Sequence, residues 1–185
     1  MHVKDAIEKR RAYRALAPVE ITEDTVRDLA EAAHLAASCF NNQPWRFVFV
    51  RERDMLERLF ETLPDGNAWA RASSMIVAVA SRPDLDCQIM GRDYFLFDTG
   101  MATAHLVLRA TELGLVAHPI AGYSPKKVRG VLGIPDDMTV ITLVIVGRHT
   151  DEISDALSEA QAAGEAKRPE RHPFDEFAYL ETYGG

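Results

Sequence analysis

The stretch Ser38-Cys39-Phe40-Asn41-Asn42-Gln43-Pro44-Trp45 lies between an alanine-rich segment of helical pattern and an alternating apolar segment. Its hydroxyl and amide side chains offer hydrogen-bond donors and acceptors, which can match the carbonyl and N–H edges of a planar heterocycle. Pro44 fixes its own φ and favours an extended Gln43, so we expect a stiff loop. The same residue types also cap helices and form turns in proteins that bind no ligand. Taken alone, the stretch slightly favours the cap and turn.

A basic cluster lies about thirty residues upstream, in Lys9-Arg10-Arg11-Ala12-Tyr13-Arg14. The periodicity of the surrounding segment predicts a helix from Val3 to Leu16 that gathers the three arginines on one patch. A phosphate would compensate the repulsion, because the planar guanidinium matches its oxygens. The alternative is a solvated face in which Asp5 and Glu8 neutralise the arginines.

Together the two segments resemble the nitroreductase family of FMN-dependent oxidoreductases. Its members open with an Arg-Arg/His-Ser-x-Arg/Lys helix, followed by Ser-x-x-Asn-x-Gln-Pro-Trp. The second motif is complete here, as Ser38, Asn41, Gln43, Pro44 and Trp45. Pro119-Ile120-Ala121-Gly122-Tyr123 resembles a later flavin-contacting turn, so the resemblance extends from about Ala6 to Arg171. It implies an α+β fold: a three-layer sandwich with a mixed, mostly antiparallel sheet between helices, in a domain-swapped homodimer.

The resemblance also implies which residues hold FMN at the dimer interface. Arg10, Arg168 and Arg171 are expected at the phosphate, and Arg14, with Arg71, near flavin N1 and O2. Ser38, Asn41 and Gln43 are expected at the ring and ribityl chain. The remaining expected contacts are Arg11, Ala12, Cys39, Phe40, Asn67, Pro119, Ile120, Ala121 and Gly122. Ala12 replaces the usual Ser and Ala37 the usual Pro.

The implied reaction is a ping-pong hydride transfer. NAD(P)H visits as a transient reductant, and a small acceptor such as a nitroaromatic or a quinone follows it over the same flavin face. No protein residue is required as a catalytic proton donor, since solvent can serve. Other flavin chemistry, such as dehalogenation or breakdown of the flavin itself, is an alternative, as is a flavin-binding sensor with little turnover. A phosphate-binding module without flavin would leave Ser38 to Trp45 without a purpose.

Composition limits the class of protein. The chain has 185 residues, of which 47% are hydrophobic, and this suits one domain with a sizeable core. Acidic residues outnumber basic ones 28 to 21, for a formal net charge of −7, which argues against a nucleic-acid surface. No run approaches the roughly 20 apolar residues of a membrane span, and we expect a cytoplasmic protein.

Cysteine and histidine spacing predicts neither a disulfide framework nor a metal site. Cys39 and Cys87 are expected to be free thiols, with Cys39 a small residue beside the ligand. The six histidines are scattered without metal-ligand spacing. We therefore predict no metal.

The remaining pattern alternates helices and strands within a single domain, residues 1–185. Helices are expected at about 22–37, 54–63, 67–72, 94–113, 124–133 and 153–163, and strands at 46–50, 75–80, 115–120 and 139–147. Residues 150–185 form a C-terminal extension. Its aromatic side chains are expected to dock on the body or on a partner subunit, and they are Phe174, Phe177, Tyr179 and Tyr183.

Overall fold

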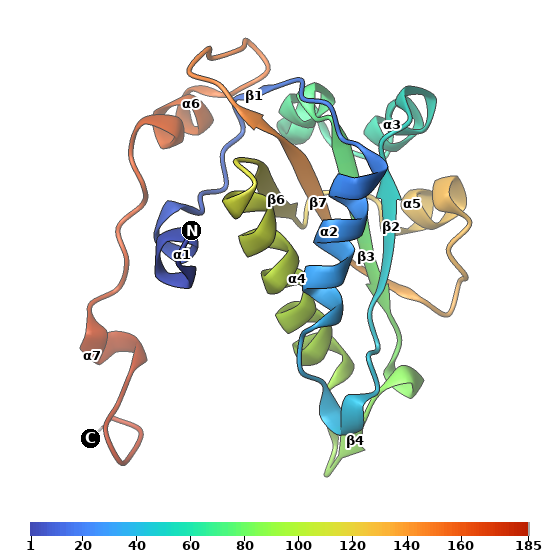
Figure 1. The fold of residues 1–185 in the computed structure, drawn as a ribbon, viewed down its shortest axis with the longest axis vertical. Coiled ribbons are helices and arrows are strands. Elements are labelled where there is room, and N and C mark those ends of the chain that lie inside the picture. The colour runs from blue at the N-terminus through green and yellow to red at the C-terminus, as the bar shows by residue number, and fades with distance from the viewer. Residues whose placement is uncertain (185) are drawn as a thin grey trace.

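The computed structural model describes residues 1–184, and its centre is an antiparallel sheet (Figure 1). The long strand β7 (Thr139–His149) pairs with β3 (Met75–Ser81), which pairs with β2 (Arg46–Val50). Along its other edge β7 pairs first with β6 (Val116–Ile120) and then with β1 (Leu16–Ala17). All strand pairings among the described residues are antiparallel. The resemblance implied a mixed, mostly antiparallel sheet, so no parallel pair is found among these residues.

Alternate residues of β3 and β7 supply two separate cores, one on each face of the sheet. On one face α2 (Glu23–His34) and α4 (Phe95–Glu112) pack together over the strands. Their side chains bury the odd-numbered residues of β3 and the even-numbered residues of β7. This core includes Leu29, Ala33, Met75, Val77, Val79, Ala102, Leu106, Val144 and Val146.

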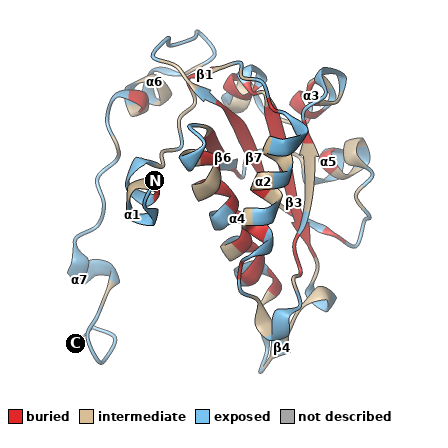
Figure 2. Cartoon of the chain, in the orientation of Figure 1, coloured by how far each residue is buried: buried red, intermediate tan, exposed pale blue. Residues whose placement is uncertain are grey.

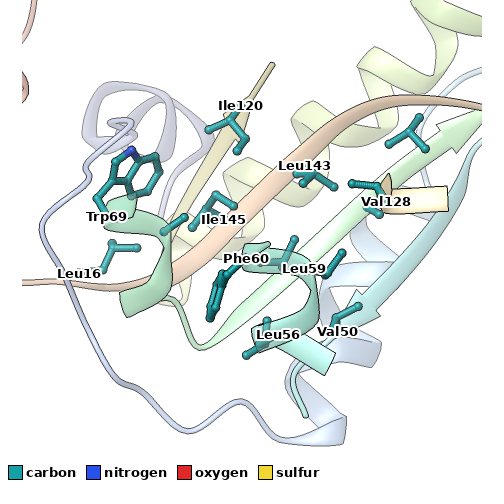
Figure 3. Close-up of a cluster of buried hydrophobic side chains, with 14 of the residues drawn as sticks. Leu16, Val50, Leu56, Leu59, Phe60, Trp69, Ile120, Val128, Leu143 and Ile145 are labelled. Atoms are coloured by element: carbon teal, nitrogen blue, oxygen red, sulfur yellow. The ribbon is translucent and has the colours of Figure 1, made fainter. Parts of the chain in front are cut away.

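The opposite face is covered by α3 (Arg53–Phe60), the 3-10 helix η2 (Asp65–Ala72) and α5 (Pro125–Leu132). Figure 3 shows the resulting core, with Phe60, Leu59 and Leu56 at one part and Trp69 at another. Ser124 caps α5, and Gly133 ends it with a φ of 65°, as the sequence indicates. The three-layer α+β arrangement is thus confirmed.

The first segment departs from the sequence prediction. Helix α1 covers only Val3–Lys9, and the chain from Arg10 to Ala15 is not helical. The backbone N–H groups of Arg14 and Ala15 donate to the carboxylate of Glu165 at 2.9 and 3.2 Å, bonds that a helix interior does not allow. Tertiary contacts therefore override the helical periodicity, and the arginines do not share one helix face.

The connection between β3 and α4 contains a short 3-10 helix, η3 (Pro83–Leu85), and a hairpin of β4 (Gln88–Ile89) and β5 (Arg92–Asp93). The expectation of free thiols is wrong here, because Cys39 and Cys87 form a disulfide with their Cα atoms 6.1 Å apart. The bond joins this connection to the 3-10 helix η1 (Cys39–Asn41). Nothing in the sequence spacing of 48 residues indicated the proximity.

The C-terminal extension holds α6 (Glu159–Ala166) and α7 (Phe174–Phe177). Helix α6 starts six residues later than predicted and continues through Gly164, because Ser158 and Gln161 form a capping box at its start. After α6 the chain runs along the outside of the body, and its aromatic side chains are exposed (Figure 2). In the single chain they do not dock on the body. No helix of residues 1–184 is both long enough and apolar enough to cross a membrane.

Candidate functional site

Three arginines converge where the end of α1 meets the C-terminal segment. The Nη2 atom of Arg168 donates to the backbone carbonyls of Glu8 and Arg10 at 2.5 and 2.8 Å. Burial lowers the pKa of Arg10, and the nearby charges of Arg168 and Arg171 lower it further. Within residues 1–184, none of the three guanidiniums pairs with a carboxylate. The cluster suits an oxyanion, because the cations repel one another and an anion between them would relieve the repulsion.

Glu165 and Arg11 hold the C-terminal segment against the first loop. The buried Glu165 carboxylate accepts the two backbone N–H bonds described above, and His149 Nε2 lies 3.8 Å from its Oε2 atom. Arg11 donates to the carbonyls of Gly164 and Glu165, both at 3.0 Å, and lies 4.4 Å from the ring centroid of Tyr13. Arg11 was expected at the cofactor, but its guanidinium is committed to this anchor.

Arg14 lies above a stack of two rings. Its guanidinium carbon is 5.8 Å from the Trp69 ring, which stacks on His118 with centroids 4.9 Å apart. Burial lowers the pKa of His118, and the charges of Arg14 and Arg10 act in the same direction. The neutral ring donates its Nδ1–H to the carbonyl of Tyr13 at 3.0 Å. The hydrogen bond from His118 therefore fixes the backbone at Tyr13. The positive charge of Arg14 remains beside the two stacked rings.

Asn67 and the turn after β6, each expected at the flavin, lie in contact with each other. Asn67 Nδ2 donates to the carbonyl of Gly122 at 2.7 Å, and its Oδ1 accepts from Trp69 Nε1 at 3.2 Å. A Cβ atom on Gly122 would lie only 2.6 Å from that nitrogen, so a side chain at this position would displace the Asn67 amide. Pro119 and Ile120 belong to β6, and Ala121 and Gly122 are exposed beyond its end.

Arg71 is not brought to this group. Its guanidinium donates to Glu57 at 3.3 Å and to Glu61 at 2.7 Å, and it lies 5.5 Å from the ring of Phe60. These partners belong to α3 and to the turn that follows it. The structure gives no support to the expectation of Arg71 near the flavin, because two carboxylates already compensate its charge.

The loop from Ser38 to Gln43 contains three non-glycine residues in the left-handed region. Phe40, Asn41 and Gln43 have φ values of 46°, 59° and 50°. The extended Gln43 predicted from Pro44 is therefore wrong: the Ser38 Oγ accepts from Gln43 N–H at 3.0 Å, and Gln43 Nε2 donates to the Asn41 carbonyl at 3.1 Å. Such backbone conformations cost energy and cluster at ligand sites.

The ends of this loop are held firmly. The Ser81 hydroxyl donates to the carbonyl of Pro44 at 2.9 Å, and the Cys39 N–H donates to the buried Asp98 carboxylate at 2.6 Å. Between these anchors Phe40 is 88% exposed, and Asn41 is exposed as well. The loop thus presents its tip to the surroundings rather than to the interior of its own chain.

The predicted site residues form two groups at opposite ends of the molecule (Figure 1). One group is joined by the contacts of the first loop, the C-terminal segment and the turn after β6; it contains Arg10, Arg11, Ala12, Arg14, Asn67, Pro119, Ile120, Ala121, Gly122, Arg168 and Arg171. The other lies beside β4 and contains Ser38, Cys39, Phe40, Asn41 and Gln43. A single chain does not bring them together.

Sequence reasoning missed several residues that shape the first group. The loop of residues 10–15 is positioned by Glu165, Trp69 and His118. No local pattern distinguishes these three from ordinary helix, core and strand residues. Asp98 was also missed, although an acidic residue in the first turn of a largely apolar helix is an available signal. Their roles depend on contacts between segments far apart in the chain.

Comparison with known proteins agrees with these observations. The family model described as the nitroreductase family matches residues 7–148. A protein of Archaeoglobus fulgidus, provisionally named NADH dehydrogenase/NAD(P)H nitroreductase, is 32% identical over 147 residues, which is 77% of this chain and 83% of that protein. An NADH dehydrogenase of Thermus thermophilus is 26% identical over 188 residues, covering 82% of this chain and 89% of that one.

Solved structures agree as well. The chain superposes on one described as the oxidoreductase containing FMN with a TM-score of 0.84 and 27% identity, covering 100% of this chain and 94% of that one. It also superposes on a nitroreductase family protein of Clostridium novyi NT, with a TM-score of 0.75 and 25% identity over 82% of this chain and 87% of that one.

Proposed function

The chain belongs to the nitroreductase family, and we propose that it is an FMN-dependent NAD(P)H oxidoreductase whose two cofactor sites are each shared between the subunits of a homodimer. The proposed acceptors are small oxidised molecules such as nitroaromatics and quinones. The match spans most of the chain and includes both candidate segments, so the oxidoreductase class follows from the family.

The observation that carries the proposal is the uncompensated arginine cluster. Burial lowers the pKa of Arg10, the nearby charges of Arg168 and Arg171 lower it further, and no carboxylate among residues 1–184 pairs with any of the three. The FMN phosphate carries about two negative charges near neutral pH and fits such a cluster by charge and by geometry. A purely structural role for the cluster would leave its repulsion unrelieved.

Arg14 supports the proposal from the other end of the cofactor. The stacked rings of Trp69 and His118 connect Arg14 to β6 and the turn that follows it. A fixed cation beside flavin N1 and O2 stabilises the negative charge that reduction places there. Because His118 is neutral, Arg14 rather than the imidazole supplies this charge.

A partner subunit supplies the missing loop in this proposal. The Ser38–Gln43 loop lies far from the arginine cluster of its own chain, so a second copy must bring the groups together. Helix α4 offers an apolar stripe for that contact, because Phe97, Gly100 and Ala104 are exposed at helical spacing. The exposed aromatic residues of the C-terminal extension provide a second contact.

When bound, FMN would supply hydride-transfer chemistry between NAD(P)H and the acceptor, and the residues named above would hold it. The chain's residues bind and orient. In the proposed dimer the amides of Asn41 and Gln43 and the hydroxyl of Ser38, all on the strained loop, would bind the ring and ribityl chain. No side chain of the proposed site is needed as a proton donor, because solvent can serve.

The test is an absorbance spectrum of the purified chain with and without added FMN, followed by anaerobic NADH or NADPH. The proposal predicts a bound flavin spectrum that bleaches with one reductant and recovers when a quinone or nitroaromatic is added. Bleaching without steady turnover would indicate a sensor instead. A protein whose addition leaves the FMN spectrum unperturbed would refute the flavin assignment.

A further inference from the structure

A second polar cluster, separate from the arginines, surrounds the Cys39–Cys87 disulfide. The ligand atoms of Cys39, Cys87 and Asp86 all lie within 4.8 Å of one another. Asn42 Nδ2 lies 3.3 Å from Asp86 Oδ1 and 3.4 Å from Cys87 Sγ, so its amide closes one side of the cluster. These residues come from two segments, the Ser38–Gln43 loop and the connection before β4.

The two carboxylates of this cluster, Asp86 and Asp98, lie next to each other without a cation of the described chain between them. Asp86 Oδ2 is inaccessible and has no hydrogen-bond partner, while Oδ1 accepts the N–H of Cys87 at 2.8 Å. Asp98 is 2% exposed, accepts the Cys39 N–H at 2.6 Å and lies next to the Asp86 carboxyl group. Among residues 1–184, no lysine, arginine or histidine pairs with either acid. Two carboxylates beside two sulfurs, without a cation, form an unfilled set of ligands.

We propose that the reduced form of this cluster binds a thiophilic divalent cation such as Zn²⁺ through Cys39, Cys87 and Asp86, and that the disulfide is its closed, cation-free form. A Zn–S bond of about 2.3 Å in a tetrahedral site places two sulfurs about 3.8 Å apart, which requires only a small separation of the present pair. The fourth position is open to water or to Asp98. The proposal goes beyond the proposed function and does not depend on flavin.

The chemistry balances with an external dithiol as reductant. The dithiol is oxidised to its disulfide, the Cys39–Cys87 bond breaks, and each protein sulfur gains one hydrogen. Zn²⁺ then displaces both thiol protons as the two thiolates bind. Either the disulfide or the cation would cross-link the Ser38–Gln43 loop to the connection before β4, whereas the reduced, metal-free chain lacks that link.

The experiment compares the full chain, with whatever flavin it carries, in its oxidised form and after reduction by dithiothreitol and its anaerobic removal. Both are dialysed against the same Zn²⁺ buffer, and bound zinc is measured by elemental analysis and X-ray absorption. We expect one zinc per reduced chain with two sulfur ligands at about 2.3 Å, and no sulfur-ligated zinc in the oxidised chain. Alkylation of parallel samples verifies the thiol count.

Variants sharpen the result. Asp86→Asn should weaken zinc binding at least about ten-fold, and Cys87→Ser should abolish sulfur ligation. Asp93→Asn, an exposed acid of the same connection, is the matched control and should bind as the wild type does. A reduced chain with two verified thiols that takes up no zinc, or only zinc bound through nitrogen and oxygen, overturns the proposal. The comparison of the oxidised and reduced wild-type chain does not depend on whether any variant folds. Its result is also independent of whether the chain binds FMN.

Discussion

Arg10 is the residue on which the cofactor proposal depends most. Its backbone leaves the helical region at the end of α1, where its carbonyl accepts from Arg168. Partial burial and two neighbouring cations make the charged form of Arg10 costly, as its lowered pKa indicates. A site that destabilises its own empty state in this way gains on binding a phosphate, because the ligand removes the repulsion.

Arg10→Gln should therefore weaken FMN binding without destabilising the empty protein. Loss of a charged hydrogen bond of about 1.5–3 kcal/mol corresponds to a roughly 10–100-fold higher Kd. Fluorescence titration of FMN measures the affinity, and thermal unfolding without flavin measures stability. The control is Arg58→Gln on the exposed face of α3, which should change neither. A variant that binds FMN as tightly as the wild type would contradict the phosphate assignment.

His118 makes stability depend on pH. Its pKa is lowered in the folded chain by burial first and by Arg14 and Arg10 next. Above the unfolded value of about 6.5 neither state is protonated, and below it the unfolded chain takes up a proton that the folded ring refuses. The free energy of unfolding should thus fall as pH drops below about 6.5, by at most about 1.4 kcal/mol per pH unit.

Urea unfolding at several pH values checks this. His118→Gln should lose this part of the acid sensitivity, whereas His105→Gln, at an exposed position on α4, should keep it. Equal pH dependence in the wild type and in His118→Gln would show that the buried imidazole is not the responsible group.

Among the elements, α6 owes its place to Glu165. The carboxylate of this buried residue accepts hydrogen bonds from the backbone N–H groups of Arg14 and Ala15. Arg11 reinforces the contact from the other side through the carbonyls of Gly164 and Glu165. One acidic side chain therefore fixes the position of residues 10–15 relative to Arg168 and Arg171.

Glu165→Ala should loosen α6 while leaving the sheet folded. Two backbone donors lose their acceptor, at a cost of about 1–3 kcal/mol each when they stay buried. Hydrogen exchange should accelerate in residues 10–17 and 158–171 and remain unchanged in β3. Glu170→Ala removes an exposed acid paired only with Lys167 and serves as the control. Uniform exchange changes across the whole sheet would contradict a local role.

The elements predicted best are those whose local signals agree with their tertiary contacts. Strand β3 reads as a continuous apolar run because both of its faces are buried, and α5 carries its Ser124 cap and Gly133 stop in the sequence. The segment after Lys9 misled prediction because Glu165, about 150 residues away, takes the N–H groups that a helix would use. Helix α6 was placed too early for a similar reason: its start is set by the Ser158 capping box rather than by composition.

At the scale of the whole molecule, the two groups of predicted site residues can meet only through assembly. Asn67 and Gly122, each predicted separately as a flavin contact, are in contact within one chain. The sequence alone did not show that Arg71 pairs with Glu57 and Glu61. Acids such as these can pair with any nearby solvent-exposed basic residue. The Cys39–Cys87 bond likewise depends on how η1 meets the hairpin, which no local pattern encodes.

The proposed dimer makes a prediction about α4. Ala104 is exposed on the apolar stripe beside Gly100, so Ala104→Glu should fold normally and yet fail to dimerise. Light scattering coupled to size exclusion measures the mass. Gly130→Glu introduces the same charge at an exposed position of α5 with nothing within 4 Å of the new Cβ, and should leave the mass unchanged. A dimeric Ala104→Glu chain would place the interface elsewhere.

The most direct test of the shared site mixes two defective chains. One carries Arg10→Gln with Arg168→Gln, and the other carries Ser38→Ala with Asn41→Ala; each alone should bind FMN poorly. After subunit exchange in equal amounts, half of the dimers are mixed, and each mixed dimer holds one intact site. About a quarter of all sites should then regain wild-type FMN affinity and NAD(P)H-dependent activity. No recovery, despite verified exchange, would contradict a cofactor site shared between subunits.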